Sequence, residues 1–395
     1  MEGCLDFLEQ LRFEEDDLRY LHEGLGFTAG DLEAFRRFRF TGEVWAIPEG
    51  RIAFAGEPLV EVTAPLPEAQ LIETFLLNQV TFESTIASKA ARSVIAAAGK
   101  EAVDFSFRRT HGIEAGIDVA RLSAMVGFAA TSNVEAARRF GLVAAGTMAH
   151  SYVEAFPTEV EAFRAFAQDF PGRVTFLVDT YDTILGVREA IAVIRELRLE
   201  GRIGIRLDSG ALVDLSKKAR RLLDRAGLER VRIVVSGSLD ELAIDDLVRS
   251  GAPIDSFGVG TQMGVSADYP YLDSAYKLVR YENRPVMKLS RDKVTAPGRK
   301  QVFRRVRPFG DLLGLHEEPP PAGRERLLEP LMTEGKRRSK RPSLSQSRAL
   351  FEADLAVLPQ GARELRAPKP PKVRSTNALR KLTAETRHRL QAGLR

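Results

Sequence analysis

Polar residues follow several short apolar segments in the middle of the chain, and their types suit the binding of anions. Arg108 and Arg109 come directly after the segment VDFSF. Two neighbouring guanidinium groups can form forked hydrogen bonds to carboxylate or phosphate oxygens. Small residues, which let backbone N–H groups approach a phosphate, end two later segments: Ser236, Gly237 and Ser238 after RIVV, and Gly258, Gly260 and Thr261 in FGVGT.

A histidine and several acidic residues lie at the ends of the other apolar segments. His150 ends GTMAH, Asp179 and Asp182 lie in LVDTYDT, and Asp208 in IRLDSG is followed by Ser209. Each pattern alone is weak evidence for a binding site, because arginines often form salt bridges within the protein and glycines often form turns. Six such endings in succession predict one site for a phosphate-bearing substrate and a carboxylate-sized anion, with a magnesium ion near the acidic residues.

The apolar segments that precede these residues are predicted to be parallel strands. They alternate with amphipathic helices such as AIAVIRELRLEG and LSKKARRLLDRAG, and a parallel pair of strands needs such a crossover. No strand–GxGxxG–helix or Walker A motif is present, which argues against Rossmann and P-loop folds. A closed or nearly closed β/α barrel is predicted, with its chemistry at the carboxyl ends of the strands. The strand candidates are VDFSF, LVAAGTM, VTFLVD, IGIRLD, RIVVSG and IDSFGVG.

The rest of the chain is predicted to form a second structural part. Residues 4–40 have the apolar spacing of short helices, and residues 41–63 read as a small antiparallel β unit cut by turn residues. A long helix is expected from Pro67 to Ala98, with Gly99 after its end. The predicted domains are residues 1–100 (flanking), 101–270 (barrel) and 271–395 (flanking, with a basic helical tail).

Composition predicts a soluble, cytoplasmic protein. Of the 395 residues, 44% are hydrophobic and 28% charged, and the single cysteine, Cys4, excludes a disulfide framework or a cysteine-based zinc cluster within this chain. No apolar stretch reaches the ~18 residues of a membrane helix, so no membrane partner is expected. From Gly335 onward, 16 Lys and Arg residues face 4 Asp and Glu residues. Only the segment GKRRSKRP is dense in charge, and it has no interleaved aromatic residues for base stacking, so a nucleic-acid partner is not expected.

The motifs together resemble those of nicotinate phosphoribosyltransferases in order and spacing. The resemblance rests on VDFSFRRTHG, GFAATSNVEAARRFGLVAAGTMAHSYVEAF, LVDTYDT, IRLDSG, FGVGT and MKLSRDKVTAPGRKQVFR, and it extends from about Glu2 into the tail LPQGARELRAPKPPKVRSTNALRKL. It implies the type II phosphoribosyltransferase fold, an irregular β/α barrel with a flanking α/β domain formed by both chain ends. The basic tail would then belong to the enzyme fold.

The resemblance also implies a reaction. Nicotinate and 5-phosphoribosyl 1-diphosphate would give nicotinate mononucleotide and diphosphate, the first step of NAD salvage from nicotinate. ATP hydrolysis would be coupled to this transfer through a phosphorylated histidine, with Mg²⁺ as cofactor and a homodimer as the assembly.

Roles for particular residues follow from the same resemblance. His150 corresponds to the phosphorylated histidine, and Arg206 and Asp208 correspond to a segment beside the ribose; these three are the expected catalytic residues. No metal ligand is assigned within the protein. The expected substrate-binding residues are Arg108, Arg109, His111, Ser151, Asp179, Ser209, Ser236, Gly237, Gly258, Gly260 and Thr261.

The sequence departs from the family pattern at two places. The family's opening segment, with a tyrosine that packs on the nicotinate ring, is expected to be missing, because EGCLDFLEQLRF aligns with a later helix. Phe107 and Tyr152 are the first candidates to cover the ring instead. The family's Ser-Asn-Asp also corresponds to Ser236-Gly237-Ser238 here, which would remove one hydrogen-bond donor from the phosphoribosyl site.

Other functions stay open at this point. Nicotinamide or quinolinate phosphoribosyltransferase is the nearest alternative, although the histidine of GTMAHS and the segment PGRKQVFR favour nicotinate. A truncated, inactive homologue that kept the scaffold is a second alternative. A nucleic-acid binder that uses the basic tail ranks last.

Overall fold

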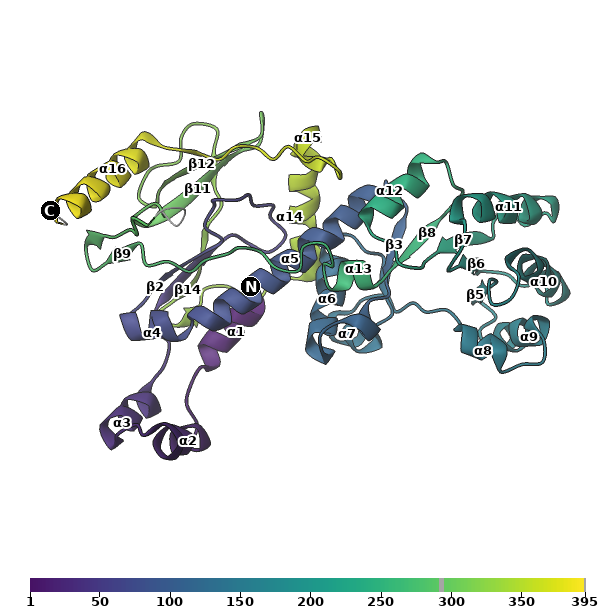
Figure 1. Ribbon diagram of the computed structural model, residues 1–395, viewed down its shortest axis with the longest axis horizontal. Helices are drawn as coiled ribbons and strands as arrows, with labels where there is room; N and C mark the ends of the chain where they lie inside the picture. Colours follow the sequence, from purple (N-terminus) through teal and green to yellow (C-terminus); the bar gives the residue numbers. More distant parts are fainter. Residues whose placement is uncertain (291–294, 394–395) are drawn as a thin grey trace. The chain divides into compact units, whose positions relative to one another are not determined.

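The computed structural model describes residues 1–290 and 295–393 of the chain (Figure 1). The chain forms two compact units: unit 1 contains Met1–Phe82, Asp273–Ala362 and Pro368–Arg395, and unit 2 contains Glu83–Leu272 and Arg363–Ala367. Unit 1 is therefore assembled from both ends of the chain. The predicted domain limits at residues 100 and 270 stay predictions. Residues 291–294, within the motif MKLSRDKVTAPGRKQVFR, lie outside the described residues.

Unit 2 is built on a curled sheet of six parallel strands. The strands pair in the order β4-β3-β8-β7-β6-β5, so β3 meets β8 while β4 and β5 form the two edges. This half-barrel confirms the predicted irregular β/α barrel. The strands are β3 Glu101–Asp104, β4 Ala130–Thr131, β5 Arg173–Leu177, β6 Arg202–Leu207, β7 Arg232–Val235 and β8 Ser256–Val259.

One predicted strand is wrong, and one short strand escaped prediction. LVAAGTM contributes only an isolated parallel bridge between Ala144 and Thr131. Its Val143 is 53% exposed, and a strand of a parallel sheet is normally buried on both faces. The strand β4 was not predicted, because its two residues are too few to show an apolar pattern.

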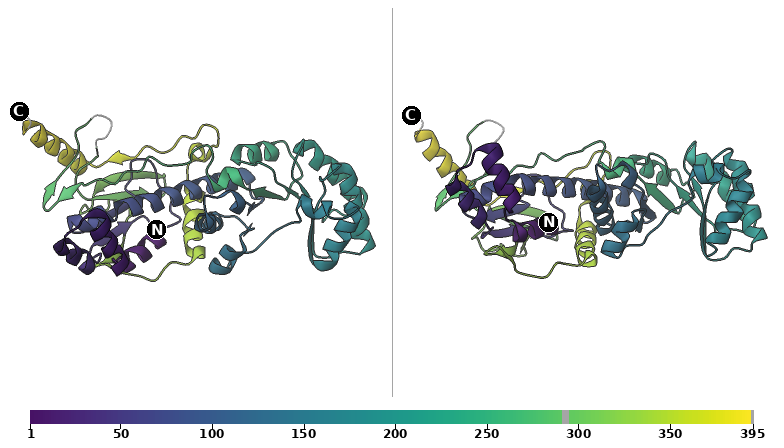
Figure 2. Two further views of the ribbon diagram at one scale, coloured as in Figure 1. Left: turned by 60° about the horizontal axis from the view of Figure 1, so that its bottom comes forward. Right: turned by 90° about the horizontal axis from the view of Figure 1, so that it is seen from below.

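Helices cover the outer side of this sheet, as crossovers between parallel strands require. Helices α9, α10 and α11 follow one another outside β5, β6 and β7 (Figures 1 and 2). Asp182 caps α10 by accepting a hydrogen bond from the backbone N–H of Leu185. The helices of unit 2 include α6 Ile113–Met125, α7 Val134–Phe140, α8 His150–Glu154, α9 Glu159–Asp169, α10 Thr183–Glu196, α11 Leu212–Arg225, α12 Glu241–Arg249, α13 Thr261–Gly264 and the 3₁₀ turn η1 Phe107–Arg109.

Unit 1 contains two four-stranded sheets and a short hairpin. One sheet has the order β15-β14-β1-β2, the other β13-β11-β12-β16, and β9 pairs with β10. The antiparallel pairing of β1 with β2 confirms the β unit predicted for residues 41–63. The strands are β1 Glu43–Ala46, β2 Val60–Thr63, β9 Arg280–Tyr281, β10 Arg284–Pro285, β11 Lys300–Arg305, β12 Gly310–Leu315, β13 Glu325–Arg326, β14 Glu329–Thr333, β15 Lys336–Arg337 and β16 Arg374–Ser375.

The predicted short helices at the start of the chain are confirmed as α1 Glu2–Gln10, α2 Glu15–Leu25 and α3 Ala29–Arg37. The predicted long helix is divided at Ile72 into α4 Leu66–Leu71 and α5 Glu73–Ala97. Ala98 and Gly99 then take positive φ angles of 48° and 87°, which end α5. The remaining helices are α14 Leu344–Val357, α15 Gln360–Arg363 and α16 Asn377–Ala392. Within the described ranges, no helix is long and apolar enough to cross a membrane.

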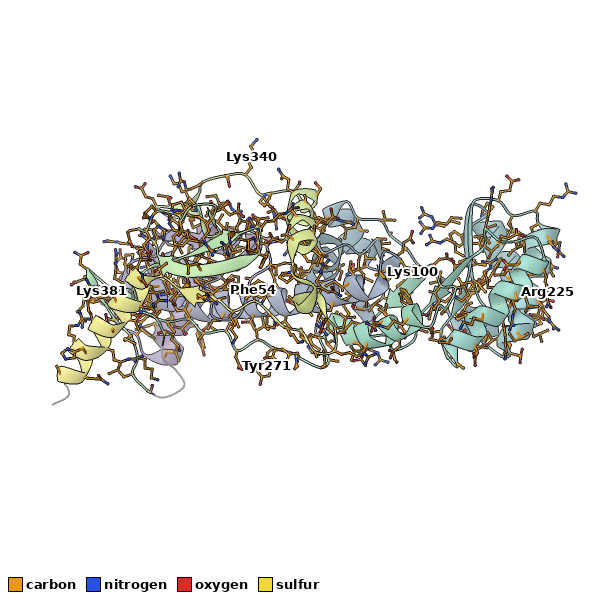
Figure 3. The ribbon with its side chains drawn as sticks, turned by 90° about the horizontal axis from the view of Figure 1, so that it is seen from above. Phe54, Lys100, Arg225, Tyr271, Lys340 and Lys381 are labelled. Carbon is orange, nitrogen blue, oxygen red and sulfur yellow. The ribbon has the colours of Figure 1, made fainter. Side chains whose placement is uncertain are left out.

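The basic tail is tied to the acidic start of the chain within unit 1. Arg337 of β15 forms ion pairs with Glu2, Asp6 and Glu9 of α1. Lys340 instead extends from the surface into solvent (Figure 3). Lys381 lies in an exposed pair with Glu385 of α16, at 3.9 Å. The tail is therefore part of the fold, and its remaining charges are largely solvated.

A fully buried ion cluster also stabilises unit 1. The Arg304 side chain has no exposed surface; it binds both oxygens of Asp311, at 3.0 and 2.6 Å, and Oδ2 of Asp354, at 2.8 Å. Asp354 also accepts hydrogen bonds from the Arg51 side chain and from the Ile52 backbone. Two carboxylates share one buried guanidinium, so the loss of that cation would leave two buried anions without their main partner.

We predict that Arg304→Met lowers the free energy of unfolding of unit 1 by ~3–5 kcal/mol, because removing the guanidinium leaves buried carboxylates without their cationic partner. Arg348→Met is the matched control, since Arg348 forms an exposed pair with Glu352 on α14 and exposed pairs contribute less than about 1 kcal/mol. Urea unfolding of both variants checks this prediction. Equal losses in the two variants would contradict it.

Candidate active site

Arg206, near the carboxyl end of β6, connects four segments of unit 2. Its Nε donates to Ser236 Oγ at 2.7 Å, its Nη1 to Thr147 Oγ1 at 2.7 Å, and its Nη2 to Asp208 Oδ1 at 2.6 Å. The Phe105 ring lies under the guanidinium, with 5.5 Å between the ring centroid and Cζ. Arg206 is therefore held by three hydrogen bonds and lies over one aromatic ring.

Asp208 is held as a charged carboxylate in this cluster. Its Oδ1 accepts from Arg206 and from Ser236 Oγ, while its Oδ2 lies 3.7 Å from His150 Nε2. Burial acts to raise the pKa of Asp208, but the hydrogen bond from Ser236, the nearby Arg206 and the nearby His150 together lower it below its ordinary value. Asp208 is thus ionised at neutral pH, with one oxygen directed toward His150.

His150 is the first residue of α8, and its side chain is 41% exposed. Its Nδ1 lies 3.2 Å from Thr180 Oγ1. The imidazole therefore has a hydroxyl beside one nitrogen and a carboxylate near the other, and it remains open to a ligand. Ser151, the next residue of α8, is exposed.

Asp179 follows β5 and fixes the turn after β6. Its Oδ2 accepts from the backbone N–H of Asp208 at 2.8 Å and from Ser209 Oγ at 3.1 Å. Its Oδ1 is buried and has no hydrogen-bond partner among the described residues. Asp179 thus positions Asp208 through the backbone and keeps one oxygen available.

The carboxylates of Asp179 and Asp208 fit a partial magnesium shell. Mg²⁺ in proteins usually keeps several waters and binds one or two carboxylates together with substrate phosphates. No group of three or more His, Cys, Asp or Glu residues in the described part of the chain is arranged to hold a metal ion. A protein cage for a metal is therefore not observed there, whereas a shell completed by substrate oxygens suits these two side chains.

Gly237 is required by the packing of two loops. It has a φ of +96°, and a Cβ atom there would lie 1.9 Å from the Asp208 carbonyl oxygen. The loop after β7 therefore lies directly against the turn after β6. Glycine at position 237 is thus demanded by this backbone contact.

The other predicted small residues lie at β8 and directly after it. Gly258 is buried inside β8, Gly260 precedes α13, and Thr261 is the exposed first residue of α13. A Cβ at Gly258 would meet the Phe105 ring at 2.6 Å. Packing against Phe105 therefore explains the glycine at 258 without a bound phosphate.

Arg108, Arg109 and His111 lie in and just after the turn η1, which follows β3, and all three are exposed. Their side chains form no hydrogen bond or ion pair with other described residues, so the two guanidinium groups are available to an anion. Asp104 orders the start of this turn: it accepts from Ser106 N and Oγ and from Thr131 Oγ1 at 2.6–2.9 Å. Burial raises the pKa of Asp104.

The two candidates for covering the nicotinate ring differ in their surroundings. The Tyr152 ring packs against Phe156 and Phe166, with centroid distances of 5.1 and 5.6 Å. Phe107 is 37% exposed and packs against Gly116. Phe107 is therefore the candidate whose ring is less engaged with other aromatic side chains.

The structure adds residues to the site that sequence reasoning missed. Thr147 and Thr180 contact Arg206 and His150, and Phe105 packs under Arg206. Thr180 is adjacent to the predicted Asp179, and Thr147 and Phe105 each precede a predicted site residue by three positions, in the motifs LVDTYDT, GTMAHS and VDFSFRR. The only sign of these residues in the sequence was their position near a predicted strand end. That position does not tell whether a threonine contacts the site or faces solvent.

A buried acid, Glu159, lies beside the part-buried Glu189 and near Asp179 and Asp182. Glu159, the first residue of α9, is only 4% exposed. Burial raises its pKa to about 7, and a hydrogen bond with Glu189 and the charges of Glu189, Asp182 and Asp179 add to this effect. Glu159 is therefore largely protonated at acidic pH and loses its proton near neutral pH.

We predict that stability falls as the pH rises through this titration. The pKa of Glu159 is raised in the folded state, so folding binds a proton, and the stabilisation is complete below the unfolded pKa of about 4.5 and lost by about pH 7. Glu159→Gln should flatten the pH dependence of the thermal unfolding midpoint and raise that midpoint at pH 8 relative to wild type. Glu161→Gln, an exposed change on the same helix, is the control. Equal pH profiles for wild type and Glu159→Gln would contradict the raised pKa of Glu159.

The chain is similar to known proteins over most of its length. Residues 1–81 match the family model described as the nicotinate phosphoribosyltransferase N-terminal domain, and residues 101–302 match the nicotinate phosphoribosyltransferase family. The family's N-terminal domain is thus present in residues 1–81. A nicotinate phosphoribosyltransferase of Mycobacterium tuberculosis is 50% identical over 372 residues, which cover 92% of this chain and 79% of that protein.

Solved structures are similar as well. Human nicotinic acid phosphoribosyltransferase aligns with a TM-score of 0.86 at 29% identity, covering 98% of this chain and 91% of that chain. A nicotinate-nucleotide pyrophosphorylase from Pyrococcus furiosus aligns with a TM-score of 0.71 at 28% identity, covering 80% and 81%. The half-barrel, its strand-end cluster and these matches lead to one conclusion: the chain belongs to the nicotinate phosphoribosyltransferase family.

Proposed function

We propose that this chain joins nicotinate to 5-phosphoribosyl 1-diphosphate and couples the transfer to ATP hydrolysis through a phosphohistidine at position 150. The products would be nicotinate mononucleotide, diphosphate, ADP and phosphate. The observation that carries this proposal is the ionised Asp208, held by Arg206 and Ser236 with its second oxygen near His150. The dimer and the cytoplasmic location implied by the resemblance stay predictions.

Asp208 suits the chemistry at the ribose. The pyridine nitrogen of nicotinate forms the bond to C1 while the C1–oxygen bond breaks, and that electron pair leaves with the diphosphate. Positive charge develops on the ribose during this step. A fixed carboxylate of lowered pKa stabilises such charge without reorganisation, and Arg206 acts by positioning that carboxylate.

The anionic groups of the substrates need cationic partners. Arg108 and Arg109 are exposed and have no protein partner among the described residues, so they can bind the nicotinate carboxylate or the diphosphate. Asp179 and Asp208 would hold Mg²⁺, which would neutralise charge on the diphosphate when bound. Asp179 also keeps the Asp208–Ser209 turn in place through its Oδ2.

His150 suits phosphoryl transfer. A neutral imidazole has a nucleophilic lone pair near neutral pH. Attack on the terminal phosphorus of ATP would form the nitrogen–phosphorus bond, and the phosphorus–oxygen bond would break with its electrons leaving on ADP. The nearby Asp208 carboxylate compensates the positive charge that develops on the ring. Water then hydrolyses the phosphohistidine.

We predict that nicotinate is preferred over nicotinamide and quinolinate by about tenfold to hundredfold in kcat/KM. Nicotinamide lacks the carboxylate and quinolinate carries a second one, and a charge-assisted hydrogen bond to carboxylate contributes ~1.5–3 kcal/mol. Arg108→Ala and Arg109→Ala should each reduce turnover with nicotinate. Comparison of the three acceptors with 5-phosphoribosyl 1-diphosphate checks this, and equal values would contradict the assignment to nicotinate.

A second prediction tests the coupling to ATP. Labelled γ-phosphate of ATP should appear on His150 as an acid-labile, base-stable group. His150→Asn should abolish the label and leave slow, ATP-independent transfer of the phosphoribosyl group. His388→Asn, an exposed change on α16, is the control and should label normally. Label that persists in His150→Asn would show that another residue is phosphorylated.

A further inference from the structure

Lys89 of α5 is a buried cation that joins two other segments of unit 2. Its side chain is only 6% exposed. Its Nζ lies 2.6 Å from Glu241 Oε2 and donates to Asp268 Oδ1, also at 2.6 Å. Glu241 is the first residue of α12, which follows β7, and Asp268 comes after α13, which follows β8 (Figure 1). One ammonium group of α5 therefore binds the chain beyond two neighbouring strands.

The two segments that meet at Lys89 begin with the loops of small residues predicted to bind the substrate. Residues 236–238 lie between β7 and α12, and Gly260 and Thr261 lie between β8 and the rest of α13. The strands β7 and β8 pair in parallel, so both loops leave the same edge of the sheet. Lys89 is thus bound to the chain shortly after each of two adjacent loops.

The turn that carries Asp268 is joined closely to α13. Its Ser266 donates from the backbone N–H to the Met263 carbonyl at 3.1 Å and from Oγ to the Tyr269 carbonyl at 2.7 Å. These hydrogen bonds hold the turn against the end of α13. An ion pair that fixes Asp268 therefore also limits movement of α13 and of the loop before it.

The charges around Lys89 compensate one another. Glu241 is only 1% exposed, and its Oε1 accepts from Arg92 Nε at 2.8 Å. Burial acts to raise the pKa of Glu241, but Lys89 and Arg92 lower it below its ordinary value. Burial acts in the same direction on Asp268, and Lys89 lowers the pKa of that carboxyl as well. Two cations therefore face two ionised carboxylates, and each buried charge needs its partner in place.

We propose that Lys89 is a positioning residue for the phosphoribosyl substrate: it fixes the loops after β7 and β8 relative to each other, so that their backbone N–H groups converge on the substrate phosphate. Lys89 acts through Glu241 and Asp268 and does not touch the substrate. This inference rests on the transfer proposed above and on the predicted binding of its phosphoribosyl substrate by these two loops. The competing assignment is an ion pair that only stabilises unit 2.

The test measures kcat and the KM for both substrates, together with the Kd of 5-phosphoribosyl 1-diphosphate by calorimetry. Lys89→Met should raise the KM and the Kd for this substrate by about twofold to thirtyfold, the range for changes that act through neighbouring residues. The KM for nicotinate and kcat should change little, because a loss of substrate binding alone raises KM and leaves kcat unchanged. Arg92 remains as the cationic partner of Glu241 in this variant.

Asp268→Ala breaks the same connection from the other side. The Asp268 side chain is 64% exposed, so its loss leaves no buried carboxylate, and Lys89 keeps Glu241 as its partner. This variant should also raise the KM and the Kd for 5-phosphoribosyl 1-diphosphate. In the Lys89→Met background it should have almost no further effect. Asp268→Ala decides the question by itself if Lys89→Met does not fold.

Asp224→Ala is the matched control. Asp224 is 46% exposed and forms an equally short pair, 2.7 Å, with Arg220. It lies in the last turn of α11, and this helix runs back from the carboxyl ends of the strands, so Asp224 is at the far end of the helix from the substrate loops. The KM and the Kd should keep their wild-type values in this variant.

The outcomes separate the two assignments and also separate this inference from the proposed function. A lower unfolding midpoint in Lys89→Met with wild-type KM and Kd would assign Lys89 to stability alone and overturn the proposal. Equal effects of Asp268→Ala in the wild-type and Lys89→Met backgrounds would overturn the connection through Lys89. A wild-type chain that binds 5-phosphoribosyl 1-diphosphate without transferring it to nicotinate would overturn the proposed function, and the Kd values would still test Lys89.

Discussion

The contact between Arg206 and Asp208 is the interaction on which the rest of the site depends. A partly buried carboxylate stays charged only when nearby hydrogen-bond donors and cations compensate its lost hydration. Arg206 and Ser236 supply that compensation at one oxygen of Asp208 and leave the other oxygen facing His150. The parallel sheet makes this possible, since β6 and β7 bring these residues to the same edge.

Backbone contacts then make the arrangement rigid. Asp179 accepts from the backbone N–H of Asp208, and Gly237 approaches the Asp208 carbonyl so closely that no side chain fits. The loops after β5, β6 and β7 are thus all held by contacts with Asp208. A site that positions charge for a developing cation gains from such preorganisation, because little has to reorient during the reaction. The glycine at 237 contributes through its shape and its positive φ.

Much of this site could be predicted from the sequence, for a simple physical reason. Parallel strands end at one edge, so residues after successive apolar segments must converge; Asp179, Asp208 and Ser236 were predicted together on this ground, and they do meet. Thr147 and Phe105 were not predicted, because their contacts depend on side-chain directions between segments far apart in the chain. LVAAGTM failed as a strand because apolar composition does not show whether a segment has neighbours on both sides.

The compensation of buried charge differs between the Arg304 cluster of unit 1 and the strand ends of unit 2. In unit 1, Arg304 is enclosed with Asp311 and Asp354, so the buried charges largely compensate one another. In unit 2, Asp179 keeps a buried oxygen without a partner among the described residues, and Glu159 is held near neutral pKa by burial and by surrounding carboxylates. A buried carboxylate oxygen without a hydrogen-bond partner costs free energy of folding. Local stability is therefore lower at Asp179 and Glu159 than at the Arg304 cluster, and residues held at such a cost in stability are common at functional sites.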